Sequence, residues 1–215
     1  MTADFVAAME EVLDLYATPY DPLHPKVNFD EMSKQLIAET RVALPAAAGQ
    51  LERYDYEYKR NGTRNLFVIC EPQAGYRHLV ITERRTQLDF AAQMRWLVDE
   101  KYPEAETIEV VLDNLNTHKA ASLYEAFAPE EARRLMRKIR FHYTPKHGSW
   151  LNMAEIELSI LQQQCLGRRL GDAATLEAEV AAYEERRNQE KATIDWRFSL
   201  ADARTKLKRL YPSTS

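Results

Sequence analysis

The chain has 215 residues and a net charge of −4 at pH 7; hydrophobic residues make up 45% of it and charged residues 29%. This composition excludes a disordered or collagen-like chain and favours a single globular domain. Two cysteines, Cys70 and Cys165, cannot form a disulfide framework, and no apolar run approaches the roughly 20 residues that span a bilayer. We therefore expect a reduced, soluble, cytoplasmic protein with no membrane partner.

The first 60 residues carry few regular patterns. Apolar residues at helical spacing predict a helix over residues 4–17, and three prolines between residues 19 and 25 end it. A short strand is expected over residues 27–30, and the mixed signals of residues 31–60 indicate irregular chain. We expect residues 1–20 to form an N-terminal helix and linker, and residues 21–215 to form the main domain.

Strands and helices alternate from residue 65 onward. Apolar runs predict strands over residues 65–71, 76–83, 107–112 and 139–143, as in a sheet covered on both faces. Helical spacing predicts helices over residues 88–102, 119–127, 129–138, 150–166, 173–187 and 200–210. A hairpin followed by this alternation predicts an α/β fold: a mixed sheet flanked by helices, with extra N- and C-terminal helices.

Three acidic residues are candidates for a metal site because of their positions. Asp30 and Asp113 each end a predicted strand, where ligand sites of α/β sheets gather. In the predicted helix over residues 150–166, helical spacing groups Glu155 with Asn152 on a polar face, which favours Glu155 without excluding Glu157. Converging carboxylates bind Mg²⁺ and support in-line displacement at phosphorus. The alternative is structural, because aspartates after strands often cap helices or turns.

Three motifs together resemble a known family. The sequence reads FDE over residues 29–31, DNLNTHK over residues 113–119 and YTPKHGSWLNMAE over residues 143–155. This set resembles the catalytic core of DDE transposases, specifically the bacterial insertion-sequence branch related to the mariner superfamily. Residues 65–86 and 194–212 resemble the same branch, so the similarity covers nearly all of residues 20–212.

The resemblance implies an RNase H-like fold in which Asp30, Asp113 and Glu155 are the catalytic acids and hold Mg²⁺, for which Mn²⁺ substitutes. It implies a transposase that cleaves DNA and transfers strands, with transposon ends and target DNA as partners. We expect at least a homodimer on DNA, associated with the nucleoid while bound. Four residues are expected to border the site: Glu31, Asn116, His118 and Asn152.

Two features depart from the family pattern. Members usually carry an N-terminal DNA-binding region of the helix-turn-helix type, and we expect that region to be absent here. Asn28 stands where the family tends to place an apolar strand residue.

Basic residues of the second half are candidates for DNA binding, although a solvated helix face is the simpler alternative. Cations that track phosphates give binding that is steeply salt-dependent and largely independent of sequence. The candidates are Arg133, Arg134, Arg137, Lys138, Lys146 and His147.

Two other functions are compatible with the same residues. An RNase H-like nuclease or resolvase needs similar carboxylates without strand transfer. An inactive, domesticated or decayed transposase fragment would act as an interaction module.

Overall fold

The computed structural model describes residues 3–41, 45–51, 53 and 55–212. Within these residues, five strands form one sheet in the order β3-β2-β1-β4-β5. The strands are β1 (Lys26–Glu39), β2 (Tyr58–Glu71), β3 (Tyr76–Thr82), β4 (Ile108–Leu112) and β5 (Ile139–Tyr143). The first three pair antiparallel, whereas β4 runs parallel to both β1 and β5. The predicted mixed sheet is therefore confirmed.

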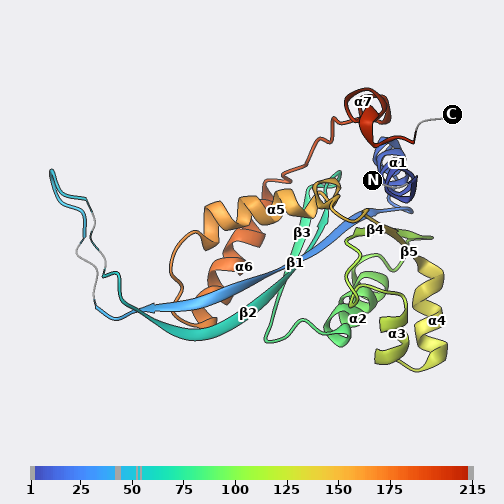
Figure 1. The fold of residues 1–215 in the computed structure, drawn as a ribbon. Coiled ribbons are helices and arrows are strands. Elements are labelled where there is room, and N and C mark those ends of the chain that lie inside the picture. Colours follow the sequence, from blue (N-terminus) through green and yellow to red (C-terminus); the bar gives the residue numbers. More distant parts are fainter. Residues whose placement is uncertain (1–2, 42–44, 52, 54, 213–215) are drawn as a thin grey trace.

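Helices cover both faces of the sheet (Figure 1). On one face lie α2 (Gln87–Trp96), α3 (Ala121–Ala126) and α4 (Pro129–Lys138). Alternate side chains of the central strands, such as Phe29 of β1 and Val110 of β4, form a fully buried core beneath them with Phe90 of α2.

The opposite face carries two separate helical groups. One comprises α5 (Ala154–Leu161) and α6 (Ala173–Gln189), which enclose Leu66, Val68 and other apolar residues of the antiparallel strands. The other comprises α1 (Ala3–Ala17) and α7 (Leu200–Lys206), which pack around Val111 and Leu151. The predicted extra helices at both ends are thus present. Within the described residues, no helix is both long and apolar enough to cross a bilayer.

The helix predicted over residues 150–166 is interrupted. A single 3₁₀ turn (Ser149–Leu151) comes first, Asn152 has an extended backbone, and α5 begins only at Ala154. A π-helical turn (Gln162–Leu166) then ends this segment. Hydrophobic spacing does not reveal the break, because Leu151 and Met153 are buried on either side of it.

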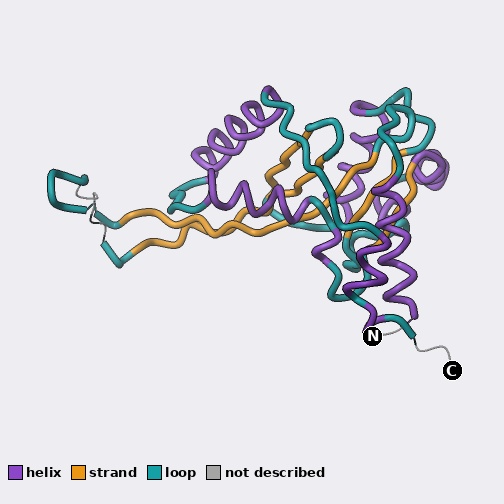
Figure 2. Tube along the Cα trace, turned by 90° about the horizontal axis from the view of Figure 1, so that it is seen from above, coloured by secondary structure: helices purple, strands orange, loops and turns teal. Residues whose placement is uncertain are grey.

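The prediction of a short first strand followed by irregular chain is wrong. β1 continues to Glu39 and pairs with β2 as far back as Tyr58. The two strands form an arm that extends well beyond the helices (Figures 1 and 2). Because most of its side chains beyond Glu31 are at least partly exposed, the arm lacks the apolar pattern on which a strand prediction relies. Backbone pairing, with one register shift between Gln35 and Ile37, holds it together.

A core substitution in α1 tests whether this helix is an integral part of the domain. Met9 is fully buried among residues of the α1 and α7 group. We expect Met9→Ala to lower the free energy of unfolding by about 2–5 kcal/mol in urea denaturation, because it leaves a cavity. Asp14→Ala, on the exposed side of the same helix, should change it by less than about 0.5 kcal/mol. Equal, small effects of the two substitutions would show that α1 is not packed as described.

Candidate active site

The register of the parallel strands aligns the first two candidate acids. Asn28 of β1 pairs with Val111 of β4, and Asp30 and Asp113 each lie two residues further on. Because side chains alternate along a strand, both aspartates lie on the face that carries α1 and α5. Asp113 directly follows β4, as predicted, whereas Asp30 does not end its strand: it is still paired with Val68 of β2.

Asp30 is the buried member of the group, with 9% of its surface exposed. Its Oδ1 accepts a hydrogen bond from the backbone N–H of Glu31 (2.8 Å), and its Oδ2 accepts one from Nδ2 of Asn152 (3.2 Å). Burial raises the pKa of Asp30 to about 7, and the negative charges of Glu155 and Asp113 add to this rise. Burial is the main cause of the shift, and the like charges of the other two acids contribute less.

Asn152 connects β1 to the start of α5. Besides Asp30, its Nδ2 donates to the carbonyl of Phe29 (2.8 Å), while its Oδ1 accepts from the backbone N–H of Ala154 (3.2 Å). Glu155 follows in the first turn of α5 and is exposed. A single buried amide therefore fixes the position of the helix that carries Glu155 relative to Asp30.

Asn28 extends this network to α1. Its Nδ2 donates to Oδ1 of Asn152 (3.1 Å) and to the hydroxyl of Tyr16 (2.5 Å), which in turn donates to the carbonyl of Leu151 (2.8 Å). The polar residue that departs from the family pattern is thus a fully buried link between two site segments. Sequence analysis missed Tyr16, because its spacing in α1 marks it only as a core residue.

The structure separates the two candidate glutamates of α5. Glu157 is fully buried and accepts hydrogen bonds from Tyr183 (2.6 Å) and Arg187 (3.2 Å), and Arg77 lies within 3.3 Å. Burial alone would raise the pKa of Glu157, but the bonds from Arg187 and Tyr183 and the charge of Arg77 outweigh it and lower the pKa. Glu157 therefore anchors α5 to β3 and α6 and is not free to serve as the candidate acid.

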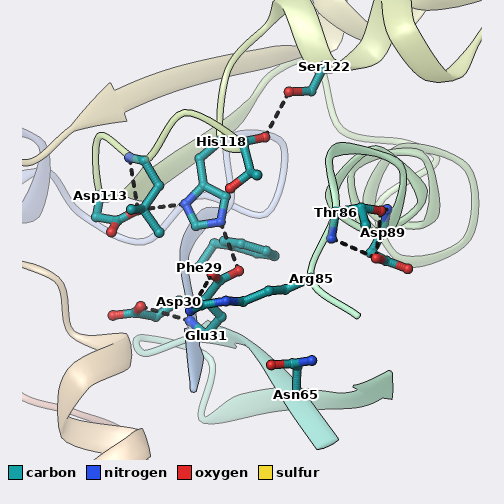
Figure 3. Close-up of polar contacts among 12 residues, drawn as sticks. Phe29, Asp30, Glu31, Asn65, Arg85, Thr86, Asp89, Asp113, His118 and Ser122 are labelled. Carbon is teal, nitrogen blue, oxygen red and sulfur yellow. Dashed lines mark hydrogen bonds and ion pairs between the residues drawn. The ribbon is translucent and has the colours of Figure 1, made fainter. Parts of the chain in front are cut away.

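A second polar network lies on the α2 side of β1 (Figure 3). Because Glu31 alternates with Asp30, it points the other way, where Oε2 meets Nε2 of His118 (3.2 Å) and Oε1 meets Arg85 (3.1 Å). Nδ1 of His118 lies 2.6 Å from Oδ1 of Asp113. Burial of His118 works against its protonation, but the bonds to Asp113 and Glu31 outweigh it and raise the pKa to about 9. His118 is thus a buried cation between two carboxylates.

Arg85 is a further residue at the site that sequence analysis missed. It directly precedes Thr86, which forms a capping box with Asp89 at the start of α2 and so fixes the chain there. Its exposed side chain lines a groove of about 210 Å³ with Glu31 and Asn116. The spacing of Thr86 and Asp89 was a detectable signal for the helix start, but not for the contact with Glu31.

The carboxylates fit a hard divalent cation. Mg²⁺ takes oxygen ligands and keeps several waters, so a few carboxylates suffice. Oδ2 of Asp113 and both oxygens of Glu155 accept no side-chain hydrogen bond within the described part of the chain. In that part, no group of three or more His, Cys, Asp or Glu side chains is placed so that it could hold a metal ion, so the fit rests on the chemistry of these acids. The mutual repulsion at Asp30 is what a bound cation would relieve.

Two of the predicted DNA-binding residues line a groove near the end of β4. Lys146 and His147 are exposed and line a groove of about 460 Å³ whose wall includes Asn114, the neighbour of Asp113. His147 has a φ of 66°, a left-handed conformation that is uncommon outside glycine.

The basic residues of α4 lie away from Asp113. Ile139, which follows α4, pairs with Ile108 at the start of β4. Arg137 and Lys138 therefore lie near the start of β4, whereas Asp113 follows its other end. Arg134 is ion-paired with Asp99 and Glu131, and Nζ of Lys138 donates to the carbonyl of Pro103. Arg133 and Arg137 are exposed on the same helix. The charge pattern of the sequence does not indicate near which end of the strands α4 places these residues.

Comparison with known proteins agrees with this geometry. The family model of DDE superfamily endonucleases matches residues 25–177, well over half of the chain and all three candidate acids. The chain belongs to this family. The resemblance noted in the sequence is thereby confirmed at the level of the DDE family. A search of curated proteins gives no match.

Solved structures of a mariner transposase share the fold. The Mos1 mariner paired-end complex with Mn superposes with a TM-score of 0.59 and 14% identity, covering 89% of this chain and 58% of that chain. For the Mos1 strand transfer complex the values are 0.55, 13%, 89% and 61%. At identities this low, the similarity shows the fold alone. It is the RNase H-like fold that the resemblance to DDE transposases implies. The chain spans about three fifths of the length of these Mos1 chains.

The two glutamates of α5 provide a matched pair of substitutions. Glu157→Gln leaves Arg77 and Arg187 buried or half-buried beside a neutral group, and we expect it to lower the free energy of unfolding by about 3–5 kcal/mol. Glu155→Gln, at an exposed position, should change it by less than about 0.5 kcal/mol. Urea denaturation at pH 7 measures both. The reverse order of the two effects would contradict the assignment of Glu157 as the anchor.

The raised pKa of Asp30 predicts a pH dependence of stability. Since the folded-state pKa of about 7 exceeds the ordinary value of 3.8, this carboxyl favours the folded state fully below pH 3.8 and loses that contribution as the pH rises through 7. Metal-free Asp30→Asn should therefore be more stable than wild type at pH 8, by on the order of 2–4 kcal/mol, with the difference closing toward pH 4. Urea denaturation in chelator at several pH values tests this. A constant difference across the range would contradict the raised pKa.

Proposed function

We propose that the chain is the catalytic part of a transposase, which cleaves DNA and joins the freed end to a target by means of Asp30, Asp113 and Glu155. The observation that carries this proposal is the placement of Asp30 and Asp113 on one face of the sheet, with the first turn of α5, which carries Glu155, tied to Asp30 through Asn152. Membership of the DDE endonuclease family supports the same residues, since its model spans all three. The Mos1 complexes that share the fold include one with Mn and one with Mg.

The chemistry follows from the placement of the three acids. Bound Mg²⁺ or Mn²⁺ would supply positive charge opposite the scissile phosphate and make the attacking hydroxyl group more acidic. Asp30 must lose its proton to contribute to such a site, which the positive charge favours. Asn152 holds one oxygen of Asp30 and the first turn of α5 together, so Glu155 is oriented toward the aspartates. Hydrolysis and strand transfer are both in-line displacements at phosphorus, so one set of carboxylates serves both.

DNA is proposed to cross the acids along the groove of Lys146 and His147. Both side chains are exposed beside Asn114, and phosphate contacts from such cations carry little sequence information. Arg85 lies on the other side of Asp113, near Asn116. A chain that is bound to DNA along this path would be associated with the nucleoid.

Two chains are proposed to act together on DNA. The connection between β1 and β2 exposes Tyr56 (84%) and Leu51 (89%). Large exposed apolar side chains of this kind favour contact with another protein surface. Three of the Mos1 structures are named as paired-end complexes, which supports the same arrangement.

A DNA assay distinguishes this function from its alternatives. The full chain is incubated with supercoiled plasmid, a labelled duplex that has free 3′ ends, and Mn²⁺ or Mg²⁺. We expect nicked plasmid and labelled joined products, both lost by at least about 100-fold in Asp113→Asn. Nicks without joining would indicate a nuclease or resolvase. Complete inertness of a folded chain would indicate an interaction module, and activity retained in Asp113→Asn would refute the assigned site.

Reversal of one groove cation tests the DNA path. Lys146→Glu should weaken binding to unrelated duplexes alike and reduce the slope of log affinity against log salt by about one. Arg137→Glu on α4, near the start of β4, is the matched control and should have a smaller effect on both quantities. Fluorescence anisotropy at several salt concentrations measures them. Equal effects of the two reversals would exclude the groove as the principal path.

A further inference from the structure

His118 is held more tightly than a loop histidine would be. The sequence places it in the connection after β4, yet its side chain is fully buried. Its ring lies edge-on to Phe29, at 5.1 Å between centroids, and packs against Phe90 at the same distance. These two aromatic rings belong to β1 and α2, so two separate elements fix the plane of the imidazole. Figure 3 shows Phe29 and His118.

Both ring nitrogens of His118 are used. Nδ1 lies 2.6 Å from Oδ1 of Asp113, and Nε2 lies 3.2 Å from Oε2 of Glu31. Ionised carboxylates only accept hydrogen bonds, so each nitrogen acts as a donor. Glu31 in turn contacts Arg85 through its other oxygen, which keeps its carboxylate in place. The ring thus joins a fixed carboxylate of β1 to the acid that follows β4.

The consequence for Asp113 is an asymmetry between its two oxygens. Oδ1 accepts from His118 and, at 3.4 Å, from the backbone N–H of Leu115. Within the described residues, no side-chain donor contacts Oδ2. Asp113 follows the end of its strand and its side chain is 31% exposed, so without these bonds it could rotate freely. One oxygen is therefore restrained, and the other remains available.

We propose that His118 is a positioning residue that orients Asp113 for metal binding through Nδ1, with Glu31 acting on Asp113 through the ring. This role rests on the proposed function, since it requires that Asp113 bind a metal ion. Glu31 and His118, which border the site, thus act indirectly, by restraining Asp113. Residues outside the ligand set that restrain a metal ligand typically change affinity by about 10- to 100-fold when substituted.

Two amide substitutions separate the two nitrogens of the ring. Asn carries a donor at about the position of Nδ1, whereas the amide of Gln reaches to about that of Nε2. We expect His118→Gln to raise the dissociation constant for Mn²⁺ by about 10- to 100-fold and His118→Asn to keep it within about threefold of wild type. Isothermal calorimetry with Mn²⁺ alone measures this on the full chain. In the nicking assay, His118→Gln should lower kcat and leave the KM for DNA unchanged.

His78 provides the control for loss of a histidine–carboxylate contact. It pairs with Glu184 of α6 at 3.1 Å and stacks on Trp96, away from the acids. His78→Gln should leave the Mn²⁺ dissociation constant unchanged. Thermal unfolding of all variants in chelator identifies any that fail to fold, and Glu31→Gln, which keeps the length of the side chain, provides a second route to the same ring. Glu31→Gln should weaken Mn²⁺ binding by a smaller factor than His118→Gln.

The outcomes distinguish this role from the proposed function itself. If wild type binds Mn²⁺ and nicks DNA but folded Asn and Gln variants of His118 match it, the positioning role is wrong and the function stands. Equal weakening by Asn and Gln would likewise overturn the action through Nδ1. If wild type binds no Mn²⁺, the proposed metal-dependent function fails, and the role of His118 fails with it.

Discussion

The site depends on the register between two parallel strands. Asn28 pairs with Val111, and the chain then needs two more residues on each strand to bring Asp30 and Asp113 to the same face. A slip of one residue in either strand would send one of these side chains to the opposite face. The register is fixed because Val27 and Phe29 must enter the core under α2 together with Val110 and Leu112. Burial of ordinary apolar residues thus aligns two acids that contribute nothing to that core.

Strand alternation then divides the polar residues into two networks. Asp30 points toward α5, where Asn152, itself bonded to Asn28, holds it, and its neighbour Glu31 points toward α2, where His118 holds it. Asp113 lies beyond the last paired residue of β4 and meets both sides. The arrangement has a cost: a carboxyl is buried near two others, and its pKa rises accordingly. Carboxyl groups at functional sites commonly have pKa values that are shifted in this way.

The sequence predicted the sheet and nearly every helix, because these features depend on local apolar patterns, and its motifs predicted the family. It did not predict the length of β1, because most side chains of the arm are at least partly exposed and form no continuous apolar face. Helical spacing could not decide between Glu155 and Glu157. That choice depends on Arg77 and Arg187, which come from β3 and α6 and meet Glu157 only after folding. The burial of His118 and the location of the α4 arginines could not be predicted for the same reason, because both are properties of the tertiary structure.

The proposed function requires above all that the carboxylates of Asp30, Asp113 and Glu155 lie close together without a neutralising side chain. The most direct measurement is the titration of the Asp30 carboxyl carbon by NMR in metal-free protein labelled with ¹³C-aspartate, with Asp30→Asn to assign the signal. The account predicts a midpoint near pH 7 in chelator, which moves to lower pH when Mg²⁺ is added. A midpoint near pH 4 without metal, the ordinary value for an aspartate, would show that Asp30 is neither buried nor close to Asp113 and Glu155 as described.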